Sequence, residues 1–287
     1  MPELPEVETI RKGLEKSIVG KAIDSFSCDT PKMLNHPLAF YQKQLKGLKV
    51  LKVERRAKMI IVRLSRDWNI LGHLKMTGQL VFHGPHKCVV GGHPIKEGFG
   101  CKPNKFTHAI FAFKDQTHLY FNDVRKFGWL RLFNSKDLEK VLAKDLGPEP
   151  LEHSFTVEGF KNELNKRPNN KIKQFLMDPK NVVGIGNIYS DEICFFAKVR
   201  PDRKVRTLKD SEISLLFRGI KLILNEAIKY EGTSISDYVN VQGEAGAYTK
   251  KLKVYQRYGQ KCLRCKEKVI RMKIGGRTSS FCPKCQK

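Results

Sequence analysis

The first residues of the chain place a reactive amine beside carboxylic acids. Met1 precedes the small residue Pro2, a context in which the initiator methionine is normally removed, so Pro2 would carry a free secondary amine. A free α-amine has a pKa of about 7.7–8.0, well below that of lysine, and a useful fraction is therefore unprotonated near neutrality. With Glu3 beside it to move protons, this amine is equipped for Schiff-base chemistry on a sugar aldehyde carbon.

The same residues also fit an ordinary helix start. Pro5 suits the first helical position, and Glu6 and Glu8 fall in a first turn that favours acids. These residues alone leave both interpretations open, and the rest of the chain favours the nucleophile.

Four cysteines near the C-terminus have the spacing of a metal site. Cys262 and Cys265 form one C-x2-C pair, and Cys282 and Cys285 form another. Four thiolates fill a tetrahedral zinc site and leave no open position, so we predict one structural Zn²⁺, with a redox or disulfide pair as the alternative. The residues between the pairs predict a β-hairpin that presents Arg277 near its glycine turn.

A glycine-containing turn at residues 183–189 lies between two helical patterns. Backbone amides at the start of the second helix, with Asn187, would bind a phosphate without reading sequence. A plain helix-packing corner is the alternative, because an isolated Gly-x-Gly is a weak motif.

Composition favours a polyanionic partner. The chain has 287 residues, with 54 lysines and arginines against 29 acids and a net charge of +25. Nucleic acid fits this balance best; an anionic membrane surface and a merely basic protein are the alternatives. No apolar run approaches the roughly 18 residues of a membrane span, and the N-terminus is too acidic for a signal peptide. The scattered Cys28, Cys88, Cys101 and Cys194 suit a reducing cytosol.

The elements that position these residues follow from periodicity. Residues 5–18 predict an amphipathic helix, with Val7, Ile10, Leu14 and Ile18 on one face. Short alternating apolar runs predict strands of a β-sandwich or barrel. They lie at residues 50–53, 59–64, 79–82, 109–113 and 118–121. A stiff linker at 146–150 precedes helical sequence at 156–231, and the cysteine module follows from residue 254.

In their colinear order, these features resemble the formamidopyrimidine-DNA glycosylase family, the Fpg/Nei superfamily of base-excision repair enzymes. The resemblance covers essentially the whole chain. Its segments are residues 1–10, 55–58, 72–78, 122–128, 184–189, 232–238, 243–246 and the cysteine module. Leu4 resembles the Fpg branch, because the endonuclease VIII branch typically has glycine there.

The resemblance implies an α+β multidomain fold. It comprises an N-terminal β-sandwich catalytic domain with a leading helix (1–147), a helix-two-turn-helix DNA-binding domain (148–253) and a zinc-ribbon hairpin (254–287). The implied activity is that of a bifunctional DNA glycosylase/AP lyase that removes 8-oxoguanine and formamidopyrimidines. The implied partner is double-stranded DNA with oxidised or abasic sites. We expect a cytoplasmic, bacterial nucleoid-associated monomer that does not bind membranes.

The family's catalytic roles map onto four residues. Pro2 would attack C1′ of the damaged nucleotide, and Glu3 would protonate the opening deoxyribose. Lys58 would bind the flanking phosphate and assist β-elimination, and Arg277 would assist δ-elimination. Glu6 would support the first helix.

The resemblance also implies a set of DNA contacts. Void-filling side chains replace the flipped nucleotide, others hold phosphates, and a loop at 233–248 closes over the base. The candidates are Met76, Arg125, Phe127, Lys173, Asn187, Thr233 and Tyr238.

The chain departs from the family pattern at four positions and in one insertion. The positions are Phe106, Val124, Lys126 and Asn169. The insertion, at about 83–105, carries His86, Cys88, His93 and Cys101. We expect a glycine-rich hairpin extension there, with a second metal site as the alternative.

Two other functions remain open. The same enzyme could prefer oxidised pyrimidines, against which Leu4 and the intact 233–248 loop argue. A non-catalytic zinc-ribbon binder would have no need for Pro2, Glu3 and Lys58 together.

Overall fold

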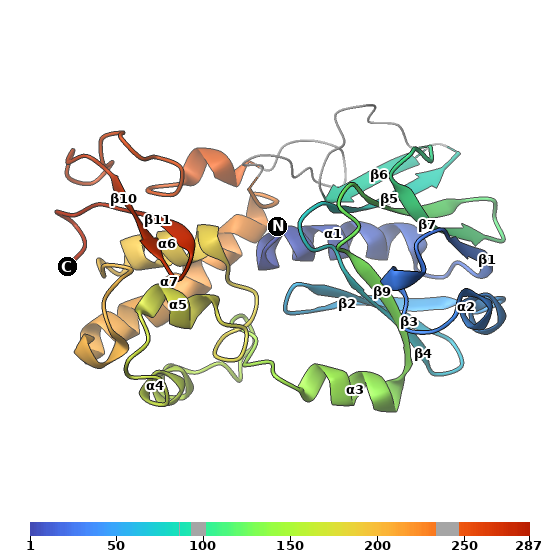
Figure 1. Cartoon of the computed structure of the whole chain (residues 1–287), viewed down its shortest axis with the longest axis horizontal. Coiled ribbons are helices and arrows are strands. Elements are labelled where there is room, and N and C mark those ends of the chain that lie inside the picture. Colours follow the sequence, from blue (N-terminus) through green and yellow to red (C-terminus); the bar gives the residue numbers. More distant parts are fainter. Residues whose placement is uncertain (86, 93–101, 234–246) are drawn as a thin grey trace. The chain divides into compact units, whose positions relative to one another are not determined.

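The computed structural model describes residues 1–85, 87–92, 102–233 and 247–287. The chain divides into two compact units. Unit 1 comprises Met1–Lys144 and Tyr230–Ala247, and unit 2 comprises Asp145–Lys229 and Tyr248–Lys287. The helical segment and the cysteine module therefore belong to one compact unit, and each unit is described separately below (Figure 1).

Unit 1 begins with the predicted amphipathic helix, α1 (Leu4–Ile18). Its predicted apolar face is confirmed: Val7, Ile10, Leu14 and Ile18 are each at most 2% exposed. Gly20 follows the helix with a φ of +88°, a conformation that costs glycine little and other residues more.

Two antiparallel sheets follow α1, which confirms the predicted β-sandwich. The five-stranded sheet has the order β1-β7-β8-β5-β6, and the four-stranded sheet has the order β2-β3-β4-β9. The strands are β1 (Ile23–Cys28), β2 (Val50–Arg56), β3 (Met59–Leu64), β4 (Trp68–His73), β5 (Gly78–Gly84), β6 (Lys87–Gly92), β7 (Thr107–Phe113), β8 (His118–Asp123) and β9 (Trp129–Asn134).

The five predicted apolar runs correspond to β2, β3, β5, β7 and β8. Strands β1, β4 and β9 were not predicted, whereas β6 lies in the expected hairpin extension. β1 lacks a clean alternation because a register shift falls between Ile23 and Ser25, so the buried positions are not evenly spaced. β6 lies in the insertion, where it pairs with β5 as a hairpin. Cys88 lies in β6, whereas His86, His93 and Cys101 lie outside the described residues.

The core of unit 1 lies between the two sheets. Helix α1 contacts the edge strand β2 of one sheet and the edge strand β6 of the other (Figure 1). Its apolar face joins buried side chains of both sheets in one cluster, among them Phe26, Val53, Phe111 and Leu130. The helix thus closes one side of the sandwich, and its N-terminal end is held by the core.

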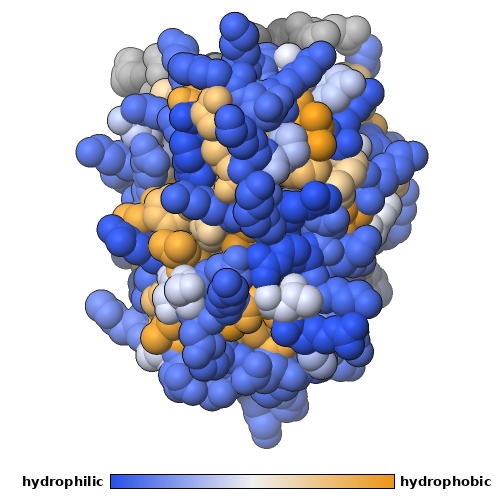
Figure 2. All heavy atoms as spheres, turned by 90° about the vertical axis from the view of Figure 1, so that its left-hand side faces the viewer, coloured by the Kyte–Doolittle hydropathy of each residue, from blue (hydrophilic) through white to orange (hydrophobic). Residues whose placement is uncertain are grey.

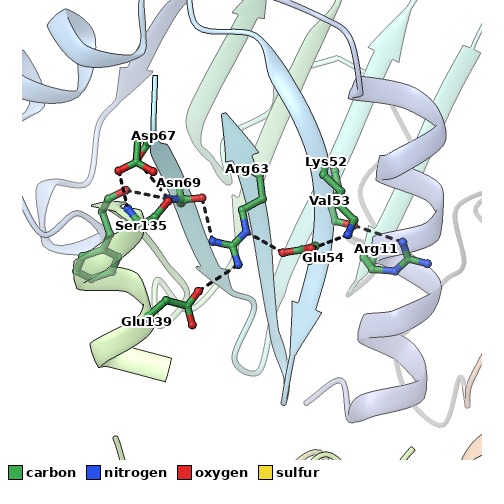
Figure 3. Close-up of polar contacts among 10 residues, drawn as sticks. Arg11, Lys52, Val53, Glu54, Arg63, Asp67, Asn69, Ser135 and Glu139 are labelled. Atoms are coloured by element: carbon green, nitrogen blue, oxygen red, sulfur yellow. Dashed lines mark hydrogen bonds and ion pairs between the residues drawn. The ribbon is translucent and has the colours of Figure 1, made fainter. Parts of the chain in front are cut away.

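Helix α3 (Ser135–Ala143) packs on the four-stranded sheet through an apolar cluster that includes Leu138 and Ile61. Beside it, Arg63 bridges three elements (Figure 3). Its guanidinium donates to Glu54 of β2 (2.7 Å), Asn69 of β4 (3.2 Å) and Glu139 of α3 (3.4 Å). These contacts satisfy polar groups at the rim of the cluster.

Unit 1 also contains α2 (Leu38–Leu45) and the short 3-10 helix η1 (Pro31–Met33).

Unit 2 contains the predicted helical segment and the predicted hairpin. Its elements are α4 (Val157–Asn165), α5 (Ile172–Met177), α6 (Asn187–Phe196), η2 (Val205–Thr207), α7 (Asp210–Lys229), η3 (Tyr248–Lys251), β10 (Ile270–Ile274) and β11 (Arg277–Phe281).

Hydrophilic side chains cover most of the face of the molecule seen in Figure 2, with separate apolar groups between them. Within the described ranges, no helix has both the length and the apolar character needed to cross a membrane.

Candidate active site and zinc centre

The N-terminal end of α1 carries the predicted nucleophile and acid. Pro2 is buried, and Glu3 and Glu6 are 3% and 2% exposed. Glu3 is the N-cap of the helix and forms a capping box with Glu6, in which the Glu3 N–H donates to Glu6 Oε2 at 2.8 Å. The positive end of the helix dipole therefore lies beside Pro2, where it disfavours a protonated amine.

Glu6 also binds the first residue of the predicted base-closing loop. Its Oε1 accepts the Thr233 N–H at 2.8 Å and the Thr233 hydroxyl at 3.0 Å. Gly232 has a φ of +84°, and a Cβ at that position would lie 2.8 Å from Glu6 Oε1. Only glycine fits there, so Glu6 fixes the N-terminus and residues 232–233 together. Tyr238 lies outside the described residues.

Lys58 lies at the turn between β2 and β3 and is half-buried. His73, on the paired strand β4, lies nearby. Burial, followed by the charges of Lys75 and Lys58, lowers the pKa of His73 to about 3. Its Nδ1 accepts the Lys75 N–H at 2.9 Å, so the proton of the neutral ring is on Nε2. His73 belongs to the sequence motif at residues 72–78. The sequence analysis assigned no role to this histidine, because neither its residue type nor its position in the motif indicated one.

The three predicted void-filling residues lie on two turns. Met76 is on the β4–β5 turn, and Arg125 and Phe127 are on the β8–β9 turn; all three are exposed. The Thr77 hydroxyl donates to the Asp123 carboxylate, and the Arg125 N–H donates to Thr77 Oγ1 at 3.1 Å. These bonds bring the two turns together, and the Arg125 guanidinium lies 4.6 Å from the centroid of the Phe127 ring.

Asp123, which the sequence did not single out, organises the second turn. It is fully buried, and its Oδ2 accepts the Gly128 N–H at 2.6 Å. A Cβ at residue 128 would lie 2.6 Å from the Phe121 ring, so glycine is required for this approach. The Asn-Asp pair before the turn was the only sequence signal for this role.

Asn187 is the first residue of α6 and follows the predicted glycine turn. Its Nδ2 donates to the Tyr255 hydroxyl at 3.4 Å. Its buried Oδ1 accepts no hydrogen bond in the part of the chain that the structure describes.

Lys173 does not have the position that was predicted for a phosphate ligand. Its side chain has no exposed surface, and its Nζ lies 2.7 Å from Asp191 Oδ1. A fully buried ammonium group that is paired with a carboxylate cannot contact a phosphate in solvent, so this prediction is wrong. The sequence pattern showed the charge of Lys173 but not its partner.

The four C-terminal cysteines form a metal-binding cluster. Their Sγ atoms all lie within 4.8 Å of one another, with 3.9 Å between Cys262 and Cys285 and 3.4 Å between Cys265 and Cys282. A tetrahedral zinc–thiolate site has sulfur–sulfur distances of about 3.8 Å, so the four thiolates fit Zn²⁺.

Arg277 lies directly after the turn of the β10–β11 hairpin and is exposed. Gly275 and Gly276 form this turn with φ values of +54° and +74°. Two consecutive positive φ angles are typical of a tight hairpin turn, in agreement with the predicted hairpin.

The four departures from the family pattern lie apart from the buried contacts of α1. Val124 and Lys126 are exposed and flank Arg125, and Asn169 is exposed before α5. Phe106 is half-buried, and its N–H donates to Asn104.

Comparison with known sequences assigns all three segments of the chain. Residues 1–130 match the formamidopyrimidine-DNA glycosylase N-terminal domain, and residues 146–239 match the formamidopyrimidine-DNA glycosylase H2TH domain. Residues 259–287 match the zinc finger found in FPG and IleRS. The chain belongs to the formamidopyrimidine-DNA glycosylase family. It is a DNA-binding glycosylase of base-excision repair that acts on damaged bases, and its cysteine cluster is a structural zinc finger.

Full-length relatives support the assignment. A formamidopyrimidine-DNA glycosylase from Pelotomaculum thermopropionicum is 39% identical over 100% of this chain and 99% of its own length. A mutant Fpg from Lactococcus lactis in complex with Fapy-dG-containing DNA has a TM-score of 0.88 at 35% identity, with 100% of both chains covered. Wild-type L. lactis Fpg bound to DNA with an oxidised pyrimidine has a TM-score of 0.86 at 34% identity, again over 100% of both chains.

The Glu6 contacts predict that the Glu6→Gln substitution destabilises the protein. In Glu6→Gln, an amide NH2 replaces one acceptor and leaves a buried N–H of Glu3 or Thr233 unsatisfied, which should lower the free energy of unfolding by about 1–3 kcal/mol. Urea denaturation measures this change. Glu15→Gln, on the same helix with a 39% exposed side chain, is the matched control and should change stability by less than about 1 kcal/mol. Equal effects of the two substitutions would contradict the assigned contacts.

The lowered pKa of His73 predicts a pH dependence of stability. The unfolded chain binds a proton at His73 below pH 6.5, whereas the folded chain binds it only near pH 3. The neutral ring therefore contributes stability above pH 6.5, and this contribution is lost as the pH falls. Between pH 6.5 and 5, wild type should lose about 2 kcal/mol more than His73→Gln. Identical pH profiles of unfolding free energy for the two proteins would refute this assignment.

Removal of zinc should unfold the cysteine module of unit 2. Because metal binding supplies the folding free energy of such a module, chelation should expose the amides of residues 259–287 to hydrogen exchange and abolish DNA binding. Unit 1 has its own core and should keep its protection at Met1–Lys144. Restoring zinc is the control, and global loss of protection on chelation is the contrary result.

Proposed function

We propose that this chain is a bifunctional DNA glycosylase/AP lyase that removes oxidised purines from double-stranded DNA through a Schiff base on Pro2. The observation that carries the proposal is the placement of the buried Pro2 at the positive end of α1, next to the buried carboxyl group of Glu3. A neutral amine and an adjacent acid are the two groups that Schiff-base formation requires.

The proposed reaction combines release of the damaged base with two elimination steps. The Pro2 nitrogen attacks C1′, the C1′–base bond breaks, and the base leaves with a proton. Glu3 protonates the ring oxygen, the sugar opens, and an iminium forms between Pro2 and C1′. Loss of the C2′ proton then breaks the bond from C3′ to its phosphate, and a second elimination breaks the bond from C5′ to its phosphate. Addition of water to the iminium releases the sugar remnant as an aldehyde and returns the free amine of Pro2.

Cationic residues assist both eliminations. Lys58 binds the phosphate next to the lesion, with the neutral Nε2–H of His73 nearby as a further donor. Arg277, exposed at the hairpin turn of unit 2, holds a phosphate for the second elimination. Guanidinium suits this role because it stays charged at all working pH values and matches phosphate geometry.

Flipping the damaged nucleotide costs a few kcal/mol, and something must fill the gap in the stack. Met76 and Phe127 are the apolar wedges, and Arg125 faces the orphaned base. Their exposed positions on two joined turns support this role, because side chains that enter a duplex must be free of the protein core.

Two substrate classes remain to be separated. Oxidised purines are favoured by Leu4 and by the relative that was solved with Fapy-dG-containing DNA. Oxidised pyrimidines are the second candidate, because wild-type L. lactis Fpg was solved with DNA of that kind. The net charge of +25 supports salt-sensitive binding to DNA. We further propose that the chain acts as a monomer on DNA of the bacterial nucleoid.

Borohydride trapping tests the proposal. A duplex with one 8-oxoguanine opposite cytosine should give a covalent adduct that mass spectrometry locates at an N-terminal Pro2, and Pro2→Gly should lose nicking but keep lesion binding. A parallel duplex carries an oxidised pyrimidine. An adduct only with the pyrimidine would shift the substrate class, and tight binding without any adduct would leave a non-catalytic zinc-ribbon binder.

A further inference from the structure

Unit 2 contains a charged pair that is sealed from solvent. Lys173 of α5 and Asp191 of α6 each have 0% exposed side chains, and Lys173 Nζ lies 2.7 Å from Asp191 Oδ1. A buried ion pair is costly to form, so it persists only where further hydrogen bonds satisfy both groups. The identity of those further partners indicates what the pair does.

Within the described residues, the further side-chain partners of this pair lie in strand β11. Asp191 Oδ1 accepts the Ser279 hydroxyl at 2.5 Å, and Oδ2 accepts the Ser280 N–H at 2.8 Å. Lys173 Nζ donates to the Thr278 carbonyl oxygen at 3.3 Å. The pair thus binds three consecutive residues of one strand, and the residue immediately before them is Arg277.

Helix α5 also lies close to the hairpin turn. Gln174 follows Lys173 on α5, and its Nε2 lies 2.6 Å from the position that a Cβ of Gly275 would occupy. The strand that begins with Arg277 is therefore held at its next three residues, while the Arg277 side chain is exposed.

A second buried acid fixes where the module begins. Glu192, next to Asp191 on α6, accepts the N–H groups of Lys253, Val254 and Tyr255, each at 2.9 Å. Adjacent residues of α6 thus hold the start of the module and its last strand. These contacts are separate from the cysteine cluster, so zinc alone does not fix the hairpin.

We propose that Lys173 and Asp191 are positioning residues that hold β11 so that Arg277 meets its phosphate during the second elimination. The inference rests on the proposed role of Arg277. It replaces the prediction that Lys173 binds DNA directly: the lysine acts on DNA only through the strand that carries Arg277.

A double-mutant cycle between Asp191→Asn and Arg277→Ala tests this coupling. The first readout is the ratio of δ- to β-elimination product from a duplex with an abasic site, in single turnover. Asp191→Asn should lower this ratio about 10-fold, with the β-elimination rate and zinc content near wild type. The double variant should be no worse than Arg277→Ala alone. A general structural defect would instead slow both eliminations equally.

The second readout is the dissociation constant for a duplex with a tetrahydrofuran abasic-site analogue, which needs no chemistry. If Asp191 acts through Arg277, each single variant should weaken binding by a similar factor, about 10-fold, and the double variant should add nothing. Additive losses would overturn the inference. If wild type gives no δ product at all, the proposed function fails, and this binding cycle still tests the positioning role.

Two further variants keep the result interpretable. Ser279→Ala removes one donor to Asp191 without leaving a buried charge unpaired, and should shift the product ratio in the same direction by a smaller factor, even if Asp191→Asn loses zinc. Lys204→Met removes an exposed lysine charge from unit 2 and should leave the ratio unchanged. The contrary result is a smaller dependence of log Kd on log salt concentration in Lys173→Met, with an unchanged product ratio. It would indicate a direct contact between Lys173 and a phosphate and would refute the inference.

Discussion

A carboxylate that leaves water must receive hydrogen bonds from the protein, and this requirement organises both units. Glu6, Asp123, Asp191 and Glu192 are each at most 3% exposed, and each accepts backbone N–H groups from a segment remote in sequence or from a turn. Because such donors come with the backbone, each acid fixes a stretch of chain rather than one side chain. Three of the four acids hold a segment that contains a residue of the candidate site: Glu6 binds Thr233, Asp123 binds the Arg125 N–H, and Asp191 binds the strand that begins with Arg277.

Tight turns position several side chains of the candidate site. Ala57, Lys75 and Lys126 have φ values of 56°, 53° and 54°, in the left-handed region that residues other than glycine rarely adopt. They directly precede Lys58, Met76 and Phe127, respectively. A left-handed residue turns the chain sharply and aims the next side chain outward, and non-glycine residues in this conformation cluster at functional sites. Asp123 binds the β8–β9 turn directly and the β4–β5 turn through Thr77, so hydrogen bonds to a buried acid stabilise two of these three turns.

The sequence predicted what depends on local spacing. The helix at 5–18, the paired cysteines and the glycine hairpin with Arg277 at its turn follow from periodicity and turn chemistry, and the structure contains each of them. The sequence did not predict β1, where a register shift breaks the alternation, or the roles of Asp123 and Asp191. Asp123 binds Thr77, 46 residues away, as well as the backbone of its own turn, and Asp191 binds Ser279 and Ser280, 88 and 89 residues away. No local sequence pattern indicates these distant partners. Lys173 was misjudged for the same reason, since its charge is visible in sequence and its burial is not.

The hydrogen bonds of Asp123 have a consequence for how such an enzyme can diversify. One acid holds the backbone of the β8–β9 turn and, through Thr77, that of the β4–β5 turn, while the three outward side chains make none of these bonds themselves. The backbone of the two turns is thereby independent of the side chains proposed as the wedge. In the proposed role, Met76, Arg125 or Phe127 can be exchanged one at a time, which would alter the DNA distortions that the enzyme detects, as long as residue 123 stays an aspartate.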